Sequence, residues 1–156
     1  MRDGYSPQDP IFLDWLAGRD TDPIQHERDW FEMAAETVNR GVAIRRARIV
    51  SEPLSDWIRH EYEITPKLNL KAGEEVRWLP RRQASGLALP GNDFWLFDDR
   101  IVRFGYFAGN GDYVGEEVVD DPGVVSLCRD AFAAVWERAV DHSDYRPDRH
   151  VPVTPS

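Results

Sequence analysis

The stretch from Asp93 to Val102 constrains the fold more than any other part of this sequence. Four large apolar residues, Phe94 to Phe97, are followed by two aspartates and an arginine, and a second apolar run begins at Ile101. A short apolar run bounded by turn residues is typical of a strand buried on both faces. Paired aspartates favour a tight turn, because their carboxylates can hydrogen-bond to the nearby backbone. The stretch therefore predicts a strand, a turn and a second strand at the centre of a mixed sheet.

The other helices and strands are expected from apolar spacing and turn residues. The pattern predicts helices over residues 11–16, 23–40, 53–65 and 122–139. It predicts strands over residues 42–50, 76–79, 94–97, 101–107 and 113–119, with a hairpin turn at 109–112. This order predicts an α/β fold (α+β mixed), with a single mixed sheet covered by helices, in one domain over residues 11–140. Residues 1–10 are expected to be a disordered lead-in and residues 141–156 a loose C-terminal tail.

The charge balance limits the kind of partner that the chain can bind. Its 156 residues carry 28 acidic and 19 basic side chains, for a net charge of −9. Proteins that bind nucleic acid usually present a basic surface, so direct contact with DNA or RNA is not expected. The sequence shows no apolar run of about 20 residues and no secretory signal. A single cysteine, Cys128, cannot form an internal disulfide, so we expect a cytoplasmic protein that makes no membrane contact.

No set of residues with recognisable catalytic spacing is present, so no catalytic residue, cofactor or metal site is expected. The histidines lack the paired spacing of a zinc site, and the acidic pairs fall at turns and element ends. Phospholipase D-type enzymes use a histidine, a lysine two positions later and an aspartate five beyond that. If Asp98 is placed on that aspartate, the other two positions hold Gly91 and Asp93, which cannot do that work.

A ligand site is expected where the strand over residues 42–50 ends. This strand carries three arginines and is followed by Ser51, Glu52 and Pro53. Ligands of open α/β folds bind at the carboxyl edge of the sheet. We therefore expect a small-ligand site built from six residues, namely Arg48, Ser51, Glu52, Arg77, Arg81 and Asp93. The simpler alternative is that the arginines pair with the surplus of surface carboxylates.

Four stretches, together with Val119–Pro122, resemble an uncharacterised actinobacterial domain family from Ile11 to about Pro147. They are Phe12–Gly18, Arg48–Asp56, Ala72–Arg81 and Asp93–Asp99. The resemblance implies a fold similar to half of a phospholipase D-type protein without its His/Lys catalytic pair, also used for effector binding in some transcription regulators. Family members are often encoded beside helix-turn-helix regulators, which implies such a regulator as a partner. The N-terminal portion is shorter here than in longer family members.

Three functions follow as hypotheses. The first is a non-enzymatic accessory or sensor domain that works with a DNA-binding transcription regulator, through protein contact or small-ligand binding. The alternative is a cryptic metal-dependent phosphoesterase or nuclease that uses Asp98 and the arginines. A third is a homodimer formed through the first helix, which carries Trp15; the six tryptophans are otherwise expected to pack in the core.

Overall fold

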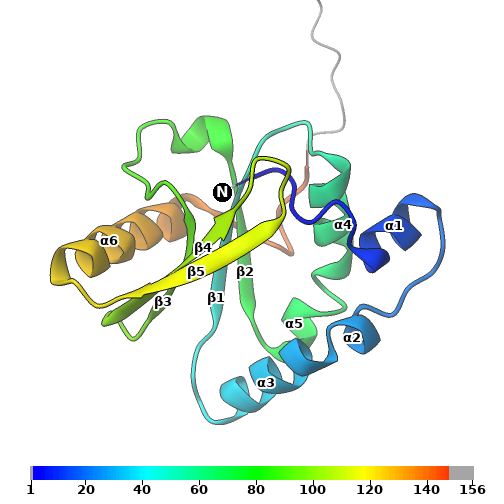
Figure 1. The fold of residues 1–156 in the computed structure, drawn as a ribbon, viewed down its shortest axis with the longest axis horizontal. Coiled ribbons are helices and arrows are strands. Elements are labelled where there is room, and N and C mark those ends of the chain that lie inside the picture. The colour runs from blue at the N-terminus through cyan, green and yellow to red at the C-terminus, as the bar shows by residue number, and fades with distance from the viewer. Residues whose placement is uncertain (1, 148–156) are drawn as a thin grey trace, which may run out of the picture.

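The strands of the described part of the chain are divided between two three-stranded sheets. The structure is a computed structural model that describes residues 2–147 (Figure 1). The first sheet has the order β1-β2-β6, with β1 and β2 parallel and β6 antiparallel to β2. The second sheet, β3-β4-β5, is an antiparallel meander. The helices are α1 (Pro10–Leu16), α2 (Pro23–His26), α3 (Arg28–Asn39), α4 (Asp56–Ile64), α5 (Asn69–Ala72), α6 (Pro122–Arg138) and the 3-10 turn η1 (Arg81–Ala84). The strands are β1 (Arg45–Val50), β2 (Glu75–Pro80), β3 (Asp93–Phe97), β4 (Ile101–Phe107), β5 (Tyr113–Val119) and β6 (Val140–Asp141).

The predicted mixed α/β fold is confirmed, but its single sheet is in fact two. β1 and β3 are both edge strands, because β1 pairs with β2 and β3 pairs with β4. The N-terminal residues contact the ends of both strands, since the hydroxyl of Tyr5 donates to Asp93 and the carboxylate of Asp3 accepts from Ser51. The stretch from residue 93 to 102 therefore forms a hairpin of the second sheet instead of the centre of a mixed sheet.

The tight turn predicted at Asp98 and Asp99 is present. Both residues have positive φ, 51° and 54°, and the backbone N–H of Arg100 donates to the carbonyl of Phe97 at 2.9 Å. Two consecutive positive φ values are typical of the type I′ turns that suit hairpins. The prediction that β3 is buried on both faces is wrong, because Phe97 is 46% exposed and the other residues of β3 are only half-buried.

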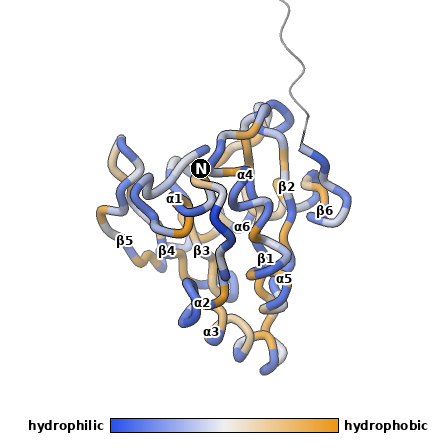
Figure 2. Tube along the Cα trace, turned by 90° about the vertical axis from the view of Figure 1, so that its right-hand side faces the viewer, coloured by the Kyte–Doolittle hydropathy of each residue, from blue (hydrophilic) through white to orange (hydrophobic). Residues whose placement is uncertain are grey.

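Helix α6 packs against both sheets and so holds them together. Its first half packs Val125 and Cys128 against Val102 of the second sheet, and its second half packs Val135 against Ile49 of the first. Figure 2 shows α6 between the two groups of strands. Asp121 begins the helix by accepting hydrogen bonds from two backbone N–H groups of its first turn. Cys128 is buried in this packing, and burial raises the pKa of its thiol.

The opposite face of the first sheet is covered by α4 and by the segment around Tyr145. Val50, Ile58, Trp78 and Tyr145 form one buried cluster there. Of the six tryptophans, Trp78 is fully buried and the others are half-buried, so the expected core role is confirmed for Trp78 alone. None of the described helices is long and apolar enough to span a membrane.

Both ends of the described chain make contacts with the rest of the domain that the sequence does not predict. Residues 2–9, expected to be disordered, lie against both sheets and lead into α1; Figure 1 shows this segment in dark blue. His142 and Tyr145, expected in a loose tail, are buried. The remainder of that predicted tail, residues 148–156, lies outside the described residues. The helix expected over 23–40 is two helices, α2 and α3, separated at Glu27.

Candidate functional site

A cavity of about 460 Å³ lies where the two sheets meet. All of β1 borders it on one side, and the start of β3 with the middle of β4 borders it on the other. The N-terminal segment, α4, α6, Arg81, Tyr113 and the loop over residues 89–92 also contribute to the wall. This volume is in the range of small-molecule sites, roughly 300–1,000 Å³. The aromatic residues that line it are Tyr5, Phe94, Trp95, Phe107, Tyr113 and Phe132.

The charge of the cavity wall is opposite to that of the whole chain. Among residues 2–147, the wall has two carboxylates, Glu61 and Asp93, against six arginines, Arg2, Arg45, Arg46, Arg48, Arg81 and Arg103. The chain as a whole has a net charge of −9. A concave, low-dielectric surface lined by one sign of charge concentrates ligands of the opposite sign. The wall therefore suits an anion that carries an apolar or planar group.

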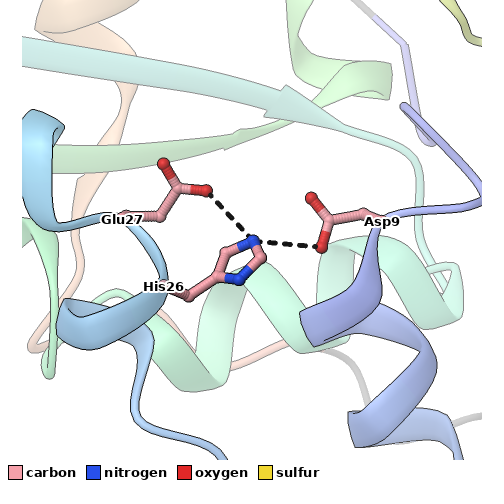
Figure 3. Close-up of side chains that lie close together, drawn as sticks. All are labelled: Asp9, His26 and Glu27. Carbon is pink, nitrogen blue, oxygen red and sulfur yellow. Dashed lines mark ion pairs between the residues drawn. The ribbon is translucent and has the colours of Figure 1, made fainter.

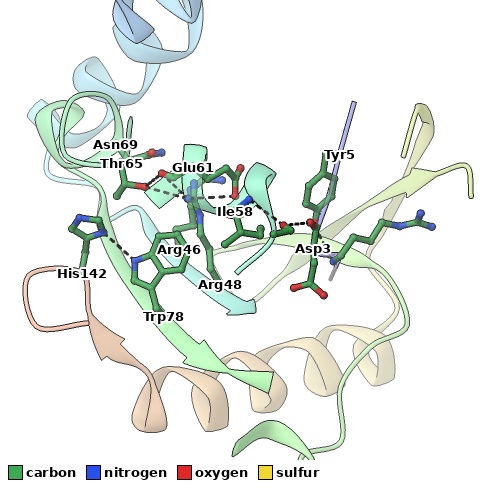
Figure 4. Close-up of polar contacts among 12 residues, drawn as sticks. Asp3, Tyr5, Arg46, Arg48, Ile58, Glu61, Thr65, Asn69, Trp78 and His142 are labelled. Atoms are coloured by element: carbon green, nitrogen blue, oxygen red, sulfur yellow. Dashed lines mark hydrogen bonds and ion pairs between the residues drawn. The ribbon is translucent and has the colours of Figure 1, made fainter. Parts of the chain in front are cut away.

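Arg48 is the most deeply buried of these arginines. Its Nη1 donates to Thr65 Oγ1 at 3.1 Å and lies 3.4 Å from Glu61 Oε2, and its guanidinium lies 5.0 Å from the ring centroid of Trp78. Figure 4 shows Arg48 pointing toward Glu61 and Thr65. Burial lowers the pKa of Arg48, and the neighbouring Glu61 carboxylate opposes that shift. These contacts hold a cation rigidly at the cavity wall.

Arg46 is fixed by two tryptophans and a buried carboxylate. Its guanidinium lies 5.4 Å from the ring centroid of Trp30 and 4.9 Å from that of Trp95. Its Nε donates to Glu74 Oε2 at 2.8 Å, while Trp30 Nε1 and Asn69 Nδ2 donate to Glu74 Oε1. Burial would raise the pKa of Glu74, but Arg46 and these hydrogen bonds outweigh it, and the pKa is lowered. The cluster joins β1 to α3, α5 and β3.

Three of the six predicted ligand residues border the cavity, and a fourth is attached to it. Arg48, Arg81 and Asp93 line the wall. Ser51 accepts a hydrogen bond from Arg81 Nε at 2.9 Å. The convergence expected at the carboxyl end of β1 is therefore present for these four.

The other two predicted residues lie elsewhere. The carboxylate of Glu52 accepts from the Tyr145 hydroxyl at 2.6 Å. Arg77 donates to the Trp136 carbonyl at 3.0 Å, with its guanidinium 4.4 Å from the centroid of that ring. Successive side chains of a strand point to opposite faces. Arg77 thus lies on the α6 side of β2, whereas its neighbour Trp78 packs with α4.

Two parts of the wall were not predicted from the sequence. The first is Arg45 and Arg46, which belong to the recognised arginine cluster but are placed at the cavity only by the register of β1. Arg2 and Tyr5 come from the segment that was expected to be disordered, which has no periodic pattern from which its position could be predicted.

The family to which this chain belongs follows from a match that includes the N-terminal segment. A family model described as a domain of unknown function, DUF6879, matches residues 1–147. The chain belongs to the DUF6879 family. The matched residues include every element that borders the cavity. No curated protein and no solved structure matches the chain.

One trio of side chains in the described part of this DUF6879 domain is close enough to hold a metal ion. His26 Nε2 lies 3.6 Å from Asp9 Oδ1 and 3.6 Å from Glu27 Oε1 (Figure 3). The same oxygen of Asp9 already accepts from the N–H groups of Ile11 and Phe12, as the N-cap of α1. These contacts describe an ion-pair cluster that links α1 to α2.

The aspartates considered for phosphodiester chemistry lie outside the cavity. Asp98 and Asp99 are exposed at the tip of the β3–β4 hairpin, and neither lines the cavity wall. The positive φ values of this turn and the hydrogen bond that closes it explain why aspartates occupy these two positions. The geometry assigns them to the turn.

Proposed function

We propose that this DUF6879 domain is a non-enzymatic sensor module that binds a small anionic ligand in the cavity between its two sheets. The observation that carries the proposal is the reversal of charge, in which six arginines line a cavity of an acidic chain. Two of them, Arg46 and Arg48, are held in place by cation–π contacts and partly buried hydrogen bonds. Cations fixed in this way bind an anion without a further cost of ordering their side chains.

The apolar part of the wall indicates what else the ligand carries. Trp95 and Phe132 line the same cavity as the arginines. Rings of this kind favour flat, polarisable groups by stacking, while guanidinium groups favour carboxylates and phosphates. The ligand class is therefore an aromatic or otherwise planar anion.

The sensor role includes a protein partner. The resemblance described from the sequence implies a helix-turn-helix regulator, and a net charge of −9 favours contact with that protein over contact with its DNA. The face of the second sheet that carries Trp95 and Arg103 also exposes Phe97, Ile101 and Val118 outside the cavity wall, and these three residues suit a protein interface. The same proposal includes a fold similar to half of a phospholipase D-type protein, of the kind used for effector binding.

Calorimetric titration with phenyl phosphate tests ligand binding, and two arginines give a matched pair of variants. Arg103 lines the cavity and Arg129 lies on α6 outside its wall, while their side chains are similarly exposed, at 45% and 47%. R103Q is expected to weaken binding about tenfold, because a hydrogen bond between charged groups contributes about 1.5–3 kcal/mol. R129Q should leave the affinity unchanged. Equal affinities for R103Q and the unmodified protein would contradict the proposal.

The partner is tested by capture of the tagged chain from its native cell extract. The proposal predicts a stoichiometric DNA-binding regulator, whose recovery is lost in I101E and retained in L127E. Ile101 and Leu127 are both exposed apolar residues, at 42% and 48%, but Leu127 lies on α6, outside the second sheet and outside the cavity wall. Recovery of the regulator with both variants would place the contact elsewhere.

A further inference from the structure

The N-terminal segment, residues 2–9, places a carboxylate on a set of anion-binding donors. Asp3 Oδ1 accepts from the backbone N–H of Ser51 at 2.7 Å, and Asp3 Oδ2 accepts from the Ser51 hydroxyl at 2.7 Å. Arg81 Nη2 lies 3.4 Å and 3.3 Å from the same two oxygens. A backbone N–H, a hydroxyl and a guanidinium that converge in this way are typical of sites for carboxylates and phosphates.

The donors are held in place by the body of the domain, independently of Asp3. Arg81 Nε donates to Ser51 Oγ at 2.9 Å, and its Nη2 also reaches the carbonyl of Ile49 at 3.3 Å. Ser51 directly follows β1, and Arg81 directly follows β2, its parallel neighbour. The carboxyl ends of two parallel strands thus form the subsite, at the sheet edge where ligands of such folds bind.

The segment that supplies the carboxylate also separates two hollows. Arg2 and Tyr5 line both the main cavity and a second hollow of about 380 Å³. The segment is attached to the second sheet by polar contacts: Arg2 donates to the Ala108 carbonyl at 2.7 Å, and the Ser6 N–H donates to the Gly111 carbonyl at 3.0 Å. Figure 4 shows Asp3 and Tyr5 on this segment, apart from the Arg48 cluster. Movement of the segment would join the two hollows.

We propose that Asp3 is a built-in occupant of this anion subsite, which the head group of the ligand displaces. The head group is a carboxylate or a phosphate monoester, and it binds the Ser51 N–H, the Ser51 hydroxyl and the Arg81 guanidinium in place of Asp3. Residues 2–9 are then released from the two sheets. This inference rests on the proposed function. It adds the position of the head group and identifies Asp3 as the group that competes with it for the subsite.

The contacts that Asp3 makes in the subsite are weak enough for the head group of a ligand to replace it. The Asp3–Arg81 pair is partly exposed, with side-chain exposures of 32% and 40%, and such pairs contribute little net stability. Burial would raise the pKa of Asp3, but the hydrogen bonds from Ser51 and the charge of Arg81 outweigh it and lower that pKa. Asp3 therefore stays charged at neutral pH and competes throughout. If Asp3 occupies the subsite most of the time, the ligand can bind only to the fraction of molecules in which the subsite is open. The apparent affinity for the ligand is then reduced by that fraction.

The test compares phenyl phosphate and benzoate binding to the full chain, D3N and the double variant D3N/R81Q by calorimetry. D3N keeps the size of the side chain and removes its charge, and it is expected to tighten binding about tenfold or more. R81Q in the D3N background should abolish that gain. D9N is the matched control, because Asp9 is on the same segment and asparagine also caps helices well, so its affinity should not change. Whichever of the two probes gains more from D3N identifies the head group.

Hydrogen exchange gives a second readout that a purely structural role of Asp3 would not produce. On saturation of the unmodified protein with phenyl phosphate, the Ser6 amide should exchange faster, because its hydrogen bond to Gly111 is released. The Ser51 amide should stay protected, because it exchanges one oxygen acceptor for another.

The outcomes separate this inference from the function on which it rests. Equal affinities of D3N and the unmodified protein, with R103Q still weakening both, would overturn the competition and leave cavity binding in place. A gain in D3N that persists in D3N/R81Q would overturn the assigned subsite. Failure of every variant to bind either probe would overturn both proposals.

Discussion

The carboxylate of Asp3 accepts hydrogen bonds from the backbone N–H and the hydroxyl of Ser51, both at 2.7 Å, although the two residues are 48 positions apart. This contact attaches the beginning of the chain to the end of β1, beside the arginine-lined cavity. It makes the N-terminal segment a part of the site.

His60 is buried at 2% exposure without a hydrogen-bond partner for either ring nitrogen among the described residues. The rings of Phe12, Trp15 and Trp57 surround it. H60F should raise the free energy of unfolding by about 1–2 kcal/mol, because it removes two unsatisfied polar atoms and keeps an aromatic ring. Urea unfolding measures this change, with H26Q on the half-exposed His26 as the control. A less stable H60F would show that these nitrogens are satisfied in solution.

Stability is expected to decrease as the pH falls below about 6.5, the ordinary pKa of histidine. Burial lowers the pKa of His60 and of His142, and the charge of Arg48 adds to the effect on His142. His142 Nδ1 accepts from Trp78 Nε1 at 3.0 Å, so its neutral form is the one that fits. Between the two pKa values the unfolded chain binds protons that the folded chain does not, so acid favours unfolding.

Urea unfolding at pH 7.5 and pH 5.5 measures this dependence. The loss is at most about 1.4 kcal/mol per pH unit for each histidine, and it should be smaller in H60F. An identical pH dependence in H60F and the unmodified protein would show that His60 does not contribute.

Two neighbouring glutamates should differ sharply in their contribution to stability. Glu74 is buried and accepts from Arg46, Trp30 and Asn69, whereas Glu75 is half-exposed and lies 3.5 Å from Arg45. E74Q should destabilise the fold by about 3–5 kcal/mol, because it leaves the Arg46 cation without its carboxylate. E75Q should change stability by less than about 0.5 kcal/mol. Similar effects of the two variants in thermal unfolding would refute this account of the Arg46 cluster.

Gly73 is required by both its backbone and its surroundings. Its φ is +95°, and a Cβ at this position would lie 2.8 Å from Val38 Cγ1. G73A should therefore lower the melting temperature by several degrees, since strain and overpacking together cost about 1–3 kcal/mol. G109A is the matched control, because a Cβ there meets nothing within 4 Å. A melting temperature of G73A equal to that of G109A would contradict the structure at α5.

Local features of the fold could be predicted from the sequence because their causes are local. The sequence predicts helices that begin at Pro23 and Pro122, and the residues before them, Asp22 and Asp121, accept from the first N–H groups of α2 and α6. The turn at Asp98 and Asp99 was predicted from the hydrogen-bonding capacity of paired aspartates. In each case the deciding interaction spans three or four residues.

The features that could not be predicted depend on distant parts of the chain. The sequence contains no signal for which strands pair, so the division into two sheets was missed. The two-residue strand β6 exists only through its pairing with Arg77 and Trp78. The candidate site also depends on distant parts of the chain. The arginine cluster on β1 can be recognised in the sequence, but Asp3 and Ser51 are brought together only by folding.

The most direct test of the account is a two-dimensional ¹⁵N NMR titration of D3N with phenyl phosphate, read at the backbone amides and the arginine Nε–H groups. We expect the largest shifts at residues 45–50, residues 92–95 and the side chains of Arg81 and Arg103, which border the cavity, and at Ser51, which accepts from Arg81. Saturating shifts confined to the outer helices, or no shifts at millimolar phenyl phosphate, would contradict the claim that this cavity binds an anion.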